Sequence, residues 1–239
     1  MDSPGNAGFR VTTIAATVAH ANADSGPFTL AIDQPYVESG ANALTVEGAN
    51  LTIVGIGEEP SEIRFIPTTA VQRLFSVGGT AAGSPSNATL TLGNNITLVG
   101  HTTGEHGSDF VRVWNGGNLY MRSGSKITGH HTDNSISNMQ DRGFGAAVLV
   151  DHNGNFTMTG GQITGNGTVH GATPRAGGVR VRANTTFIVD SGSITGNYRN
   201  SNALNPPLSD VLILNTDEHD DLFESLNANP DVGVVVRFT

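Results

Sequence analysis

Short runs of alternating apolar and polar residues recur along most of the chain, and this alternation is typical of β-strands. One unit contains three such runs, at 147–150, 156–158 and 162–164. Similar runs stand at 43–46, 51–54, 62–65, 74–77, 211–214 and 234–238. The pattern therefore predicts three short strands in each unit, and strands along nearly the whole chain.

The units follow one another at a nearly constant distance. They are marked by four isoleucines, separated by 31, 36 and 31 residues: Ile96, Ile127, Ile163 and Ile194. A glycine stands between the second and third runs of three units: Gly124, Gly161 and Gly192. Glycine accepts the positive φ that a sharp corner needs. Stacked units of this kind pair each strand in parallel with its equivalent, about 4.8 Å away.

These features predict an all-β, single-domain parallel β-helix of about six to seven coils with three strands each. An α-helical repeat is excluded, because no window within the repeats keeps apolar residues at helical spacing and Gly, Thr and Asn are frequent there. A sandwich of antiparallel hairpins is the remaining alternative, although such a sandwich does not require a constant period.

Both ends of the chain depart from the repeat. An open solenoid exposes apolar groups at its ends, so we expect an N-terminal segment with a capping α-helix over 1–26 and the β-helix over 27–239. The helix stops near 24–26 and places four apolar side chains on one face: Val11, Ile14, Val18 and Ala21. Near the C-terminus, residues 218–226 are expected to form a short helix, with Asp220 and Asp221 solvated.

Composition narrows the classes of partner. The net charge of −9 argues against binding to nucleic acid and to anionic membrane surfaces. No run of 18 apolar residues is present, so no membrane span is expected. The chain has no cysteine, which excludes disulfides and thiol catalysis. No basic and apolar leader is visible at the start of this sequence, so location is inferred from other features.

Two stretches carry a more specific resemblance. They are 154–166, which reads GNFTMTGGQITGN, and 177–197, which begins GGVRVR and ends ITGN. They resemble the right-handed parallel β-helix repeats of bacterial surface and secreted proteins in the pectate-lyase-like superfamily, including polymorphic-membrane-protein and adhesin-like repeats. The resemblance is sharpest over 110–200 and implies a right-handed β-helix at a secreted or cell-surface location. Some members are polysaccharide lyases or hydrolases and others are adhesins or glycan binders, so fold does not fix function.

Alternation in the first strand of each coil separates inward from outward positions. The inward residues are expected to be Phe75, Val77, Val111, Val113, Val148, Val150, Val179 and Val181. One outward column is then Ser76, Arg112, Leu149 and Arg180, and a second is Gly78, Trp114, Asp151 and Arg182. These columns are expected to face solvent. The loops before them vary in length, as functional loops on a rigid scaffold do.

The outward columns combine a tryptophan with guanidinium and carboxylate groups. An exposed indole stacks on a pyranose face, while arginine and aspartate bind hydroxyls or uronate carboxylates. The candidate ligand-binding residues are Phe110, Arg112, Trp114, Asp151, His152, Arg180 and Arg182. In the alternative interpretation, the 130–146 loop covers Trp114 and the arginines pair with Asp151.

An enzyme on this face would need converging carboxylates, or a calcium-holding group of aspartates with a basic residue for uronide elimination. Asp151 with Arg180 or Arg182 is the candidate catalytic set. No paired aspartates stand on a first strand, and none of the short patterns of pectate lyases or polygalacturonases can be placed. A binding role without a cofactor is therefore preferred, and calcium belongs to the enzyme alternative.

Histidines near the ends of the third strands have two interpretations. One is a metal site, with the candidate ligands His106, His130, His131 and Asp133. However, His101 and His130 follow a strand-ending glycine, at the position that Asn166 and Asn197 occupy in later coils. A stacked polar ladder that satisfies backbone groups at the corner is therefore favoured.

Together, these features predict a secreted or cell-surface module that binds a polysaccharide or host glycan through the outward face of the first strands and the adjoining loops. The alternative is a polysaccharide lyase or glycoside hydrolase that uses the same face. A structural spacer in a larger surface protein is the third possibility. In each case we expect other domains in a longer chain, and no nucleic-acid partner.

Overall fold

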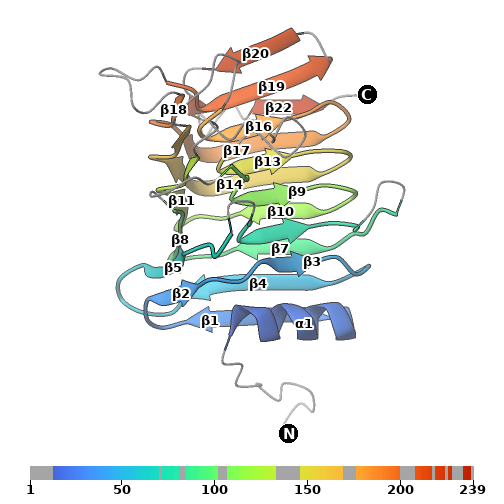
Figure 1. Cartoon of the computed structure of the whole chain (residues 1–239), viewed down its shortest axis with the longest axis vertical. Coiled ribbons are helices and arrows are strands. Elements are labelled where there is room, and N and C mark those ends of the chain that lie inside the picture. The colour runs from blue at the N-terminus through green and yellow to red at the C-terminus, as the bar shows by residue number, and fades with distance from the viewer. Residues whose placement is uncertain are drawn as a thin grey trace, which may run out of the picture.

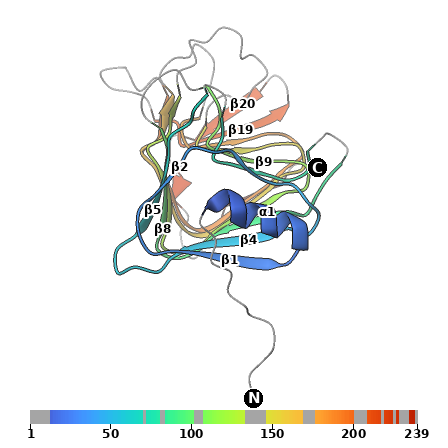
Figure 2. The same ribbon diagram turned by 60° about the horizontal axis from the view of Figure 1, so that its bottom comes forward.

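A stack of mostly parallel strands with one helix at its N-terminal end forms the protein (Figure 1). The computed structural model describes residues 13–69, 72–80, 84–101, 107–132, 146–168, 176–199, 208–216, 219–223, 226–227 and 234–237. Seen from the N-terminal end, the stack has three sides around a common interior (Figure 2). The predicted β-rich architecture with stacked parallel strands is therefore confirmed.

Each side of the stack is a set of equivalent strands from successive coils. The first-strand sheet contains β3 (Asn42–Leu44), β6 (Phe75–Val77), β9 (Val111–Val113), β13 (Val148–Val150), β16 (Val179–Val181) and β19 (Val211–Thr216). The second-strand sheet contains β1 (Pro27–Ile32), β4 (Asn50–Gly55), β7 (Thr89–Leu92), β10 (Asn118–Met121) and the first halves of β14 (Asn155–Thr164) and β17 (Thr186–Ile194).

The third side continues from the second around a corner. This third-strand sheet contains β2 (Tyr36–Glu38), β5 (Ser61–Phe65), β8 (Ile96–Val99), β11 (Ser125–Thr128) and the second halves of β14 and β17. A small three-stranded sheet follows it, formed by β12 (His131–Thr132), β15 (Gly167–Thr168) and β18 (Tyr198–Arg199). Because β14 and β17 run through the corner, the second and third sides form one continuous sheet.

Apolar side chains fill the interior in layers set by the parallel register. In the second-strand sheet, one inward row consists of Phe28, Leu51, Leu90, Leu119, Phe156 and Phe187. Phe156 and Phe187 are fully buried, and their rings stack with centroids 5.3 Å apart. Burial of one such side chain contributes about 1.5–3 kcal/mol, so the rows account for much of the stability of the stack.

The corner between the second and third sides requires glycine, as the sequence predicts. Gly124, Gly161 and Gly192 have φ values of +79°, +91° and +100°. A Cβ at Gly161 would lie 2.6 Å from the carbonyl oxygen of Ser125 in the preceding coil. Both the backbone conformation and the close approach of coils therefore exclude larger residues there.

One marker of the repeat was aligned incorrectly. Ile127 lies level with Leu98, and Ile96 lies level with Ser125. The first step of the repeat is therefore two residues shorter than the isoleucines indicate. Every position of β8 is buried, so apolar pattern alone does not set the register of this strand.

The helix α1 (Ile14–Asp24) lies across the N-terminal end of the stack, beside β1 and β4 (Figure 2). The side chain of Thr13 accepts a hydrogen bond from the Ala16 amide at 3.1 Å, which fixes the helix start. Ile14, Val18 and Ala21 are buried in the same cluster as the inward strand residues, as predicted. Val11 lies outside the described residues.

The predicted C-terminal helix at 218–226 is wrong. Its place is taken by two strands, β20 (His219–Phe223) and β21 (Leu226–Asn227). β20 runs antiparallel to β19, and β22 (Val234–Arg237) runs antiparallel to β17, so the last strand does not complete a further parallel coil. The last coil leaves unpaired strand edges, and pairing with those edges outweighs the local helical pattern. Asp220 and Asp221 therefore belong to a strand.

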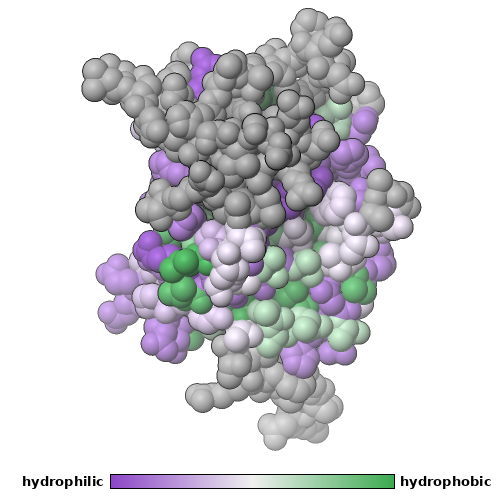
Figure 3. Space-filling view, in the orientation of Figure 1, coloured by the Kyte–Doolittle hydropathy of each residue, from purple (hydrophilic) through white to green (hydrophobic). Residues whose placement is uncertain are grey.

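Exposed large apolar side chains are few among the described residues. Four of them come from the N-terminal coils: Val37, Val46, Ile56 and Ile66. On the face shown in Figure 3, hydrophilic and apolar atoms are mixed over the described part of the surface. No helix among the described residues is long and apolar enough to cross a bilayer.

Candidate functional site

The outer face of the first-strand sheet brings the predicted columns together. Arg112, Leu149 and Arg180 lie level on β9, β13 and β16. Trp114, Asp151 and Arg182 each follow the last paired residue of the same strands, so they form the neighbouring row. The inward residues of these strands are fully buried, as predicted from alternation.

Asp151 is the centre of an ion-pair network that joins three coils. Its carboxylate accepts a hydrogen bond from Arg112 Nη2 at 2.7 Å, and Arg182 Nη1 lies 3.3 Å from it on the other side. His152 Nδ1 lies 2.6 Å from the same carboxylate. The predicted alternative in which arginines pair with Asp151 is therefore confirmed for two of them. The Asp151 carboxylate thus lies between two guanidinium groups that come from different coils.

The charge state of Asp151 follows from these partners. Burial alone would raise the pKa of its carboxyl group, but the charges of Arg182, Arg112 and His152 and the hydrogen bond from Arg112 outweigh burial. The pKa of Asp151 therefore lies below its ordinary value. Asp151 is a permanent carboxylate near neutral pH and suits the role of an orienting anion better than that of an acid.

Trp114 and Arg112 form a stacked pair at the rim of this network. The guanidinium carbon of Arg112 lies 4.3 Å from the centroid of the indole ring, within cation–π range. Both side chains are partly exposed, yet Arg112 Nε and Trp114 Nε1 are buried atoms without a hydrogen-bond partner. Two N–H donors at one stacked pair thus have no acceptor among the described residues.

A second buried carboxylate lies on the same side of the stack. Asp109, two residues before β9, is fully buried, and its Oδ2 lies 3.5 Å from Arg73 Nε, while its Oδ1 has no hydrogen-bond partner within the described ranges. Burial raises the pKa of Asp109, although Arg73, Arg112 and Arg180 counteract this. The two carboxylates of the face are therefore shifted in opposite directions while both interact with Arg112.

Arg73 was missed in the sequence analysis. Arg73 stands two residues before β6, as Asp109 stands two residues before β9, and β6 pairs with β9. The same register that aligns the strands therefore places Arg73 beside Asp109. Opposite charges at equivalent positions of successive coils were the available signal.

The expectation that the outward columns face solvent is wrong for several members. Leu149 is 3% exposed, Arg180 7% and Asp151 1%. Leu212 on β19 is also fully buried and forms a small separate apolar cluster with Ala146 and Ala176. The accessible part of the face is therefore its edge, where the side chain of Arg182 is 41% exposed and that of His152 59%.

The remaining predicted ligand-binding residue lies elsewhere. Phe110 is fully buried in the core, and its ring stacks on that of His130 with centroids 5.1 Å apart. It therefore acts from the interior and not on the accessible edge.

The predicted metal ligands do not come together among the described residues. His130 is fully buried, and its Nε2 lies 2.9 Å from the Ser108 carbonyl oxygen. Burial lowers the pKa of His131, which is half-buried. Within the described ranges, no three histidine or acidic residues are arranged to hold a metal ion. His106 and Asp133 lie outside the described residues.

A ladder of side-chain amides runs through the corner after the third strands, as predicted. The backbone amide of His130 donates to the side-chain oxygen Oδ1 of Asn166 at 3.0 Å, and the backbone amide of Asn166 donates to Oδ1 of Asn197 at 3.2 Å. The ladder ends at Asp210, whose Oδ1 accepts from both the amide and Nδ2 of Asn197 at 2.7 Å. The ladder satisfies buried backbone groups, which is a structural role.

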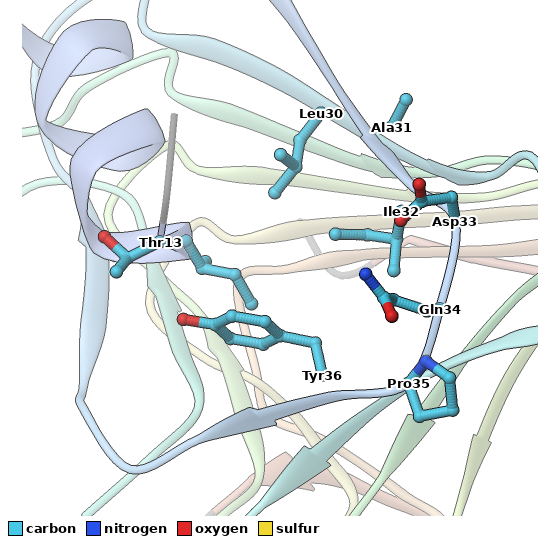
Figure 4. Close-up of a pocket in the computed structure, with 9 residues that line it drawn as sticks. Thr13, Leu30, Ala31, Ile32, Asp33, Gln34, Pro35 and Tyr36 are labelled. Atoms are coloured by element: carbon cyan, nitrogen blue, oxygen red, sulfur yellow. The ribbon is translucent and has the colours of Figure 1, made fainter. Parts of the chain in front are cut away.

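A pocket of about 270 Å³ lies between α1 and the turn that joins β1 to β2 (Figure 4). Leu30, Ile32 and Tyr36 point into this space, whereas Ala31 points away from it. Burial raises the pKa of the Tyr36 hydroxyl, and the charge of Glu38 adds to the shift. The lining contains no basic side chain. Its chemistry is therefore poorer than that of the first-strand face.

The arrangement as a whole is an arginine-rich edge with one ordered carboxylate and donors that lack acceptors. Comparison with known proteins adds no family to this description. No protein-family model matches the chain, and no curated protein or solved structure matches it.

Proposed function

We propose that the chain is a right-handed parallel β-helix module, capped by α1, that binds a glycan at the accessible edge of the first-strand face. We further propose that it acts outside the cell or at the cell surface, within a longer surface protein. The observation that carries the glycan proposal is the guanidinium group of Arg182, whose side chain is 41% exposed and whose Nη1 lies 3.3 Å from the buried Asp151 carboxylate. Asp151 orients this group, and its remaining N–H donors are available to an acceptor-rich ligand at the exposed edge.

The charges of this edge favour a glycan with acidic groups. Arg73, Arg112, Arg180 and Arg182 face Asp109 and Asp151, which leaves an excess of guanidinium groups on a protein of net charge −9. Guanidinium groups bind carboxylate and sulfate oxygens in two-point geometry. Asp151 orients Arg112 and Arg182 before any ligand arrives, and this lowers the entropic cost of binding.

A specific observation supports a polysaccharide-active enzyme as the second candidate. Asp109 and Asp151 interact with the same arginine, and their pKa values are shifted in opposite directions. Such a divided pair is what an acid and a base or nucleophile require. Both carboxylates are almost fully buried, so access to them is poor and binding ranks first.

The test is a glycan-array screen that includes uronate-containing and sulfated saccharides. We expect the wild type to bind an acidic saccharide and Arg182→Ala to weaken binding about tenfold, because one charge-assisted contact is lost. Arg122→Ala is the matched control, since Arg122 is exposed in the turn between β10 and β11. Equal binding by wild type and Arg182→Ala, or no binding at all, would remove this face from consideration.

The enzyme candidate is tested on any saccharide that binds. Turnover that is lost in Asp109→Asn while binding persists would favour the enzyme. Binding without turnover in the wild type would leave the module as a binder.

A further inference from the structure

The outer face of the second-strand sheet is built from two regular rows of side chains. The first row consists of Pro27, Asn50, Thr89, Asn118, Asn155 and Thr186. The second row, two residues further along each strand, consists of Thr29, Thr52, Thr91, Tyr120, Thr157 and Ile188. Side chains within each row repeat about every 4.8 Å along the stack.

Neither row contains a charged residue. The chain as a whole carries 33 formally charged side chains other than histidine. Charges begin only beyond the second row, at Arg122 and Asp190. The face therefore offers hydroxyl and amide groups without the cost of desolvating an ion.

An aromatic ring lies in the middle of this polar face. Tyr120 is 38% exposed and stands between Thr91 and Thr157 in the second row. Thr91, on the preceding strand, is only 4% exposed. A tyrosine at such a place presents a ring face and a hydroxyl group together, which suits contact with an amphipathic sugar ring.

No described element covers the rows. The helix α1, the one helix in the part of the chain that the structure describes, contacts β1 and β4, but its buried residues belong to the interior cluster and so lie on the inner side. Within the first row, Asn155 Nδ2 donates to Asn118 Oδ1 at 3.2 Å, which orders these amides along the stack. Apart from the buried Thr91, the side chains of the two rows are therefore at least partly exposed among the described residues, and the amides of Asn118 and Asn155 are ordered.

We propose that the outer face of the second-strand sheet binds a neutral polysaccharide chain that lies along the stack, with Tyr120 as its stacking residue. A polymer along the stack meets at least one hydroxyl or amide group at every coil, so many weak contacts add up. The absence of charge favours a neutral chain over the acidic glycan proposed for the first-strand face. The two sites lie on different sides of the stack and are independent.

Other occupants fit the rows less well. A regular threonine array on its own resembles what an ice lattice requires, but Tyr120, Pro27 and Ile188 interrupt the hydroxyl rows. A second copy of the chain would meet the same hydroxyl and amide groups with little apolar area to bury. A neutral polysaccharide can form hydrogen bonds with the hydroxyl and amide groups of both rows and can also stack on the ring of Tyr120.

The experiment is a sedimentation assay with microcrystalline cellulose, chitin and insoluble β-1,3-glucan. We expect the wild type to bind at least one of them and Tyr120→Ala to weaken this binding about five- to tenfold, because one stacking contact is lost. Thr157→Lys, which places a charge beside Tyr120, should weaken binding at least as much. Ser193→Lys is the matched control, because Ser193 lies outside the rows, beyond the corner in β17.

Thermal melts establish that each variant is folded. Two face variants, Tyr120→Ala and Thr157→Lys, are used so that the test still stands if one of them does not fold. The proposal is overturned if the wild type sediments with none of the polysaccharides, or if both face variants bind as well as the control. Two other results without polysaccharide binding would also overturn the proposal. One is thermal hysteresis, which would indicate ice binding, and the other is dimerisation that Thr157→Lys abolishes. Arg182→Ala should leave neutral binding unchanged, which separates this site from that of the proposed function.

Discussion

The outer faces of the first-strand and second-strand sheets come from the same coils but differ in chemistry. The first carries arginines around two buried aspartates, and two of its N–H donors lack acceptors in the described part of the chain. The second carries two uncharged rows of hydroxyl and amide groups with an exposed tyrosine. Stacking of coils constrains mainly the inward residues, so each outward face is free to acquire its own ligand chemistry.

The connections explain why one face is regular and the other is not. Tight turns lead from first to second strands, with a left-handed residue at the equivalent positions Gly116, Asn153 and Asn184. Glycine and asparagine accept this conformation, so successive coils enter the second strand alike. The connections into the first strands differ in length from coil to coil. Variable entry permits irregular polar groups beside the first-strand face.

Substitutions in the interior, which both faces share, should change the free energy of unfolding more than substitutions on either outer face. Phe156→Ala should lower the free energy of unfolding by about 3–5 kcal/mol, because a fully buried ring stacked on Phe187 is lost. Thr157→Ala, the next residue and on the outer face, should change it by less than about 0.5 kcal/mol. Urea unfolding measures both. Similar losses for the two would contradict the assigned inward and outward positions.

Asparagine provides a comparison between a buried ladder and an open row. Asn197→Ala removes the hydrogen bonds to Asn166, to the Ile163 carbonyl and to Asp210, and should cost about 3 kcal/mol. Asn155→Ala on the second-strand face should cost less than about 1 kcal/mol, since that side chain is half-buried. Chemical denaturation of both variants decides this. A larger cost at Asn155 would mean that the open row, not the corner ladder, holds the coils together.

The ion-pair network should contribute less than the ladder. Asp151→Ala leaves Arg112 and Arg182 without their carboxylate and should cost about 2 kcal/mol, since both arginines are partly exposed. Asp190→Ala, an exposed aspartate on β17, is the control and should be nearly neutral. Unfolding at low and high salt is the measurement. No difference between the variants would mean that the network serves only to orient the arginines.

The smallest effect is a dependence on pH with opposite signs at the two aspartates. The pKa of Asp109 is raised in the folded state, so its contribution to stability is full below about 3.9, the usual pKa, and is lost as the pH rises through the folded pKa. The pKa of Asp151 is lowered, so its contribution is present above about 3.9 and is lost as the pH falls through the folded pKa.

Melting temperatures from pH 3 to 8 test this assignment. Asp109→Asn should flatten the pH dependence above about pH 4, and Asp151→Asn should flatten the dependence below it. If both substitutions change the melting temperature in the same pH range, above or below about pH 4, the two carboxylates do not titrate as assigned.

Much of the fold was predictable because its signals are local. Alternation and the glycine corners predicted the strands, and the inward residues of the first strands are all buried. The helix was predicted from the spacing of Ile14, Val18 and Ala21. The alignment of Ile96 was wrong, because every position in β8 is buried and a shift of two residues keeps the same face inward.

The candidate site was only partly predictable. Strand periodicity placed Trp114, Asp151 and Arg182 in one row. It left open whether the arginines pair with Asp151, as Arg112 and Arg182 do, and it could not predict that Leu149 and Arg180 are buried on an outward face. Such burial depends on what packs over the face, and pairing depends on side-chain rotamers. Neither is encoded in alternation.

The sequence by itself determined the parallel stack, its corners and which residues face inward, because these depend on local periodicity and on backbone conformations that particular residues permit. Only the tertiary structure decided the register of β8 and the antiparallel pairing of β20 and β22. It also decided that the pKa of Asp109 is raised while the pKa of Asp151 is lowered. Each of these depends on contacts between residues far apart in the chain. Edge pairing, desolvation and ion pairing arise only when the coils are stacked.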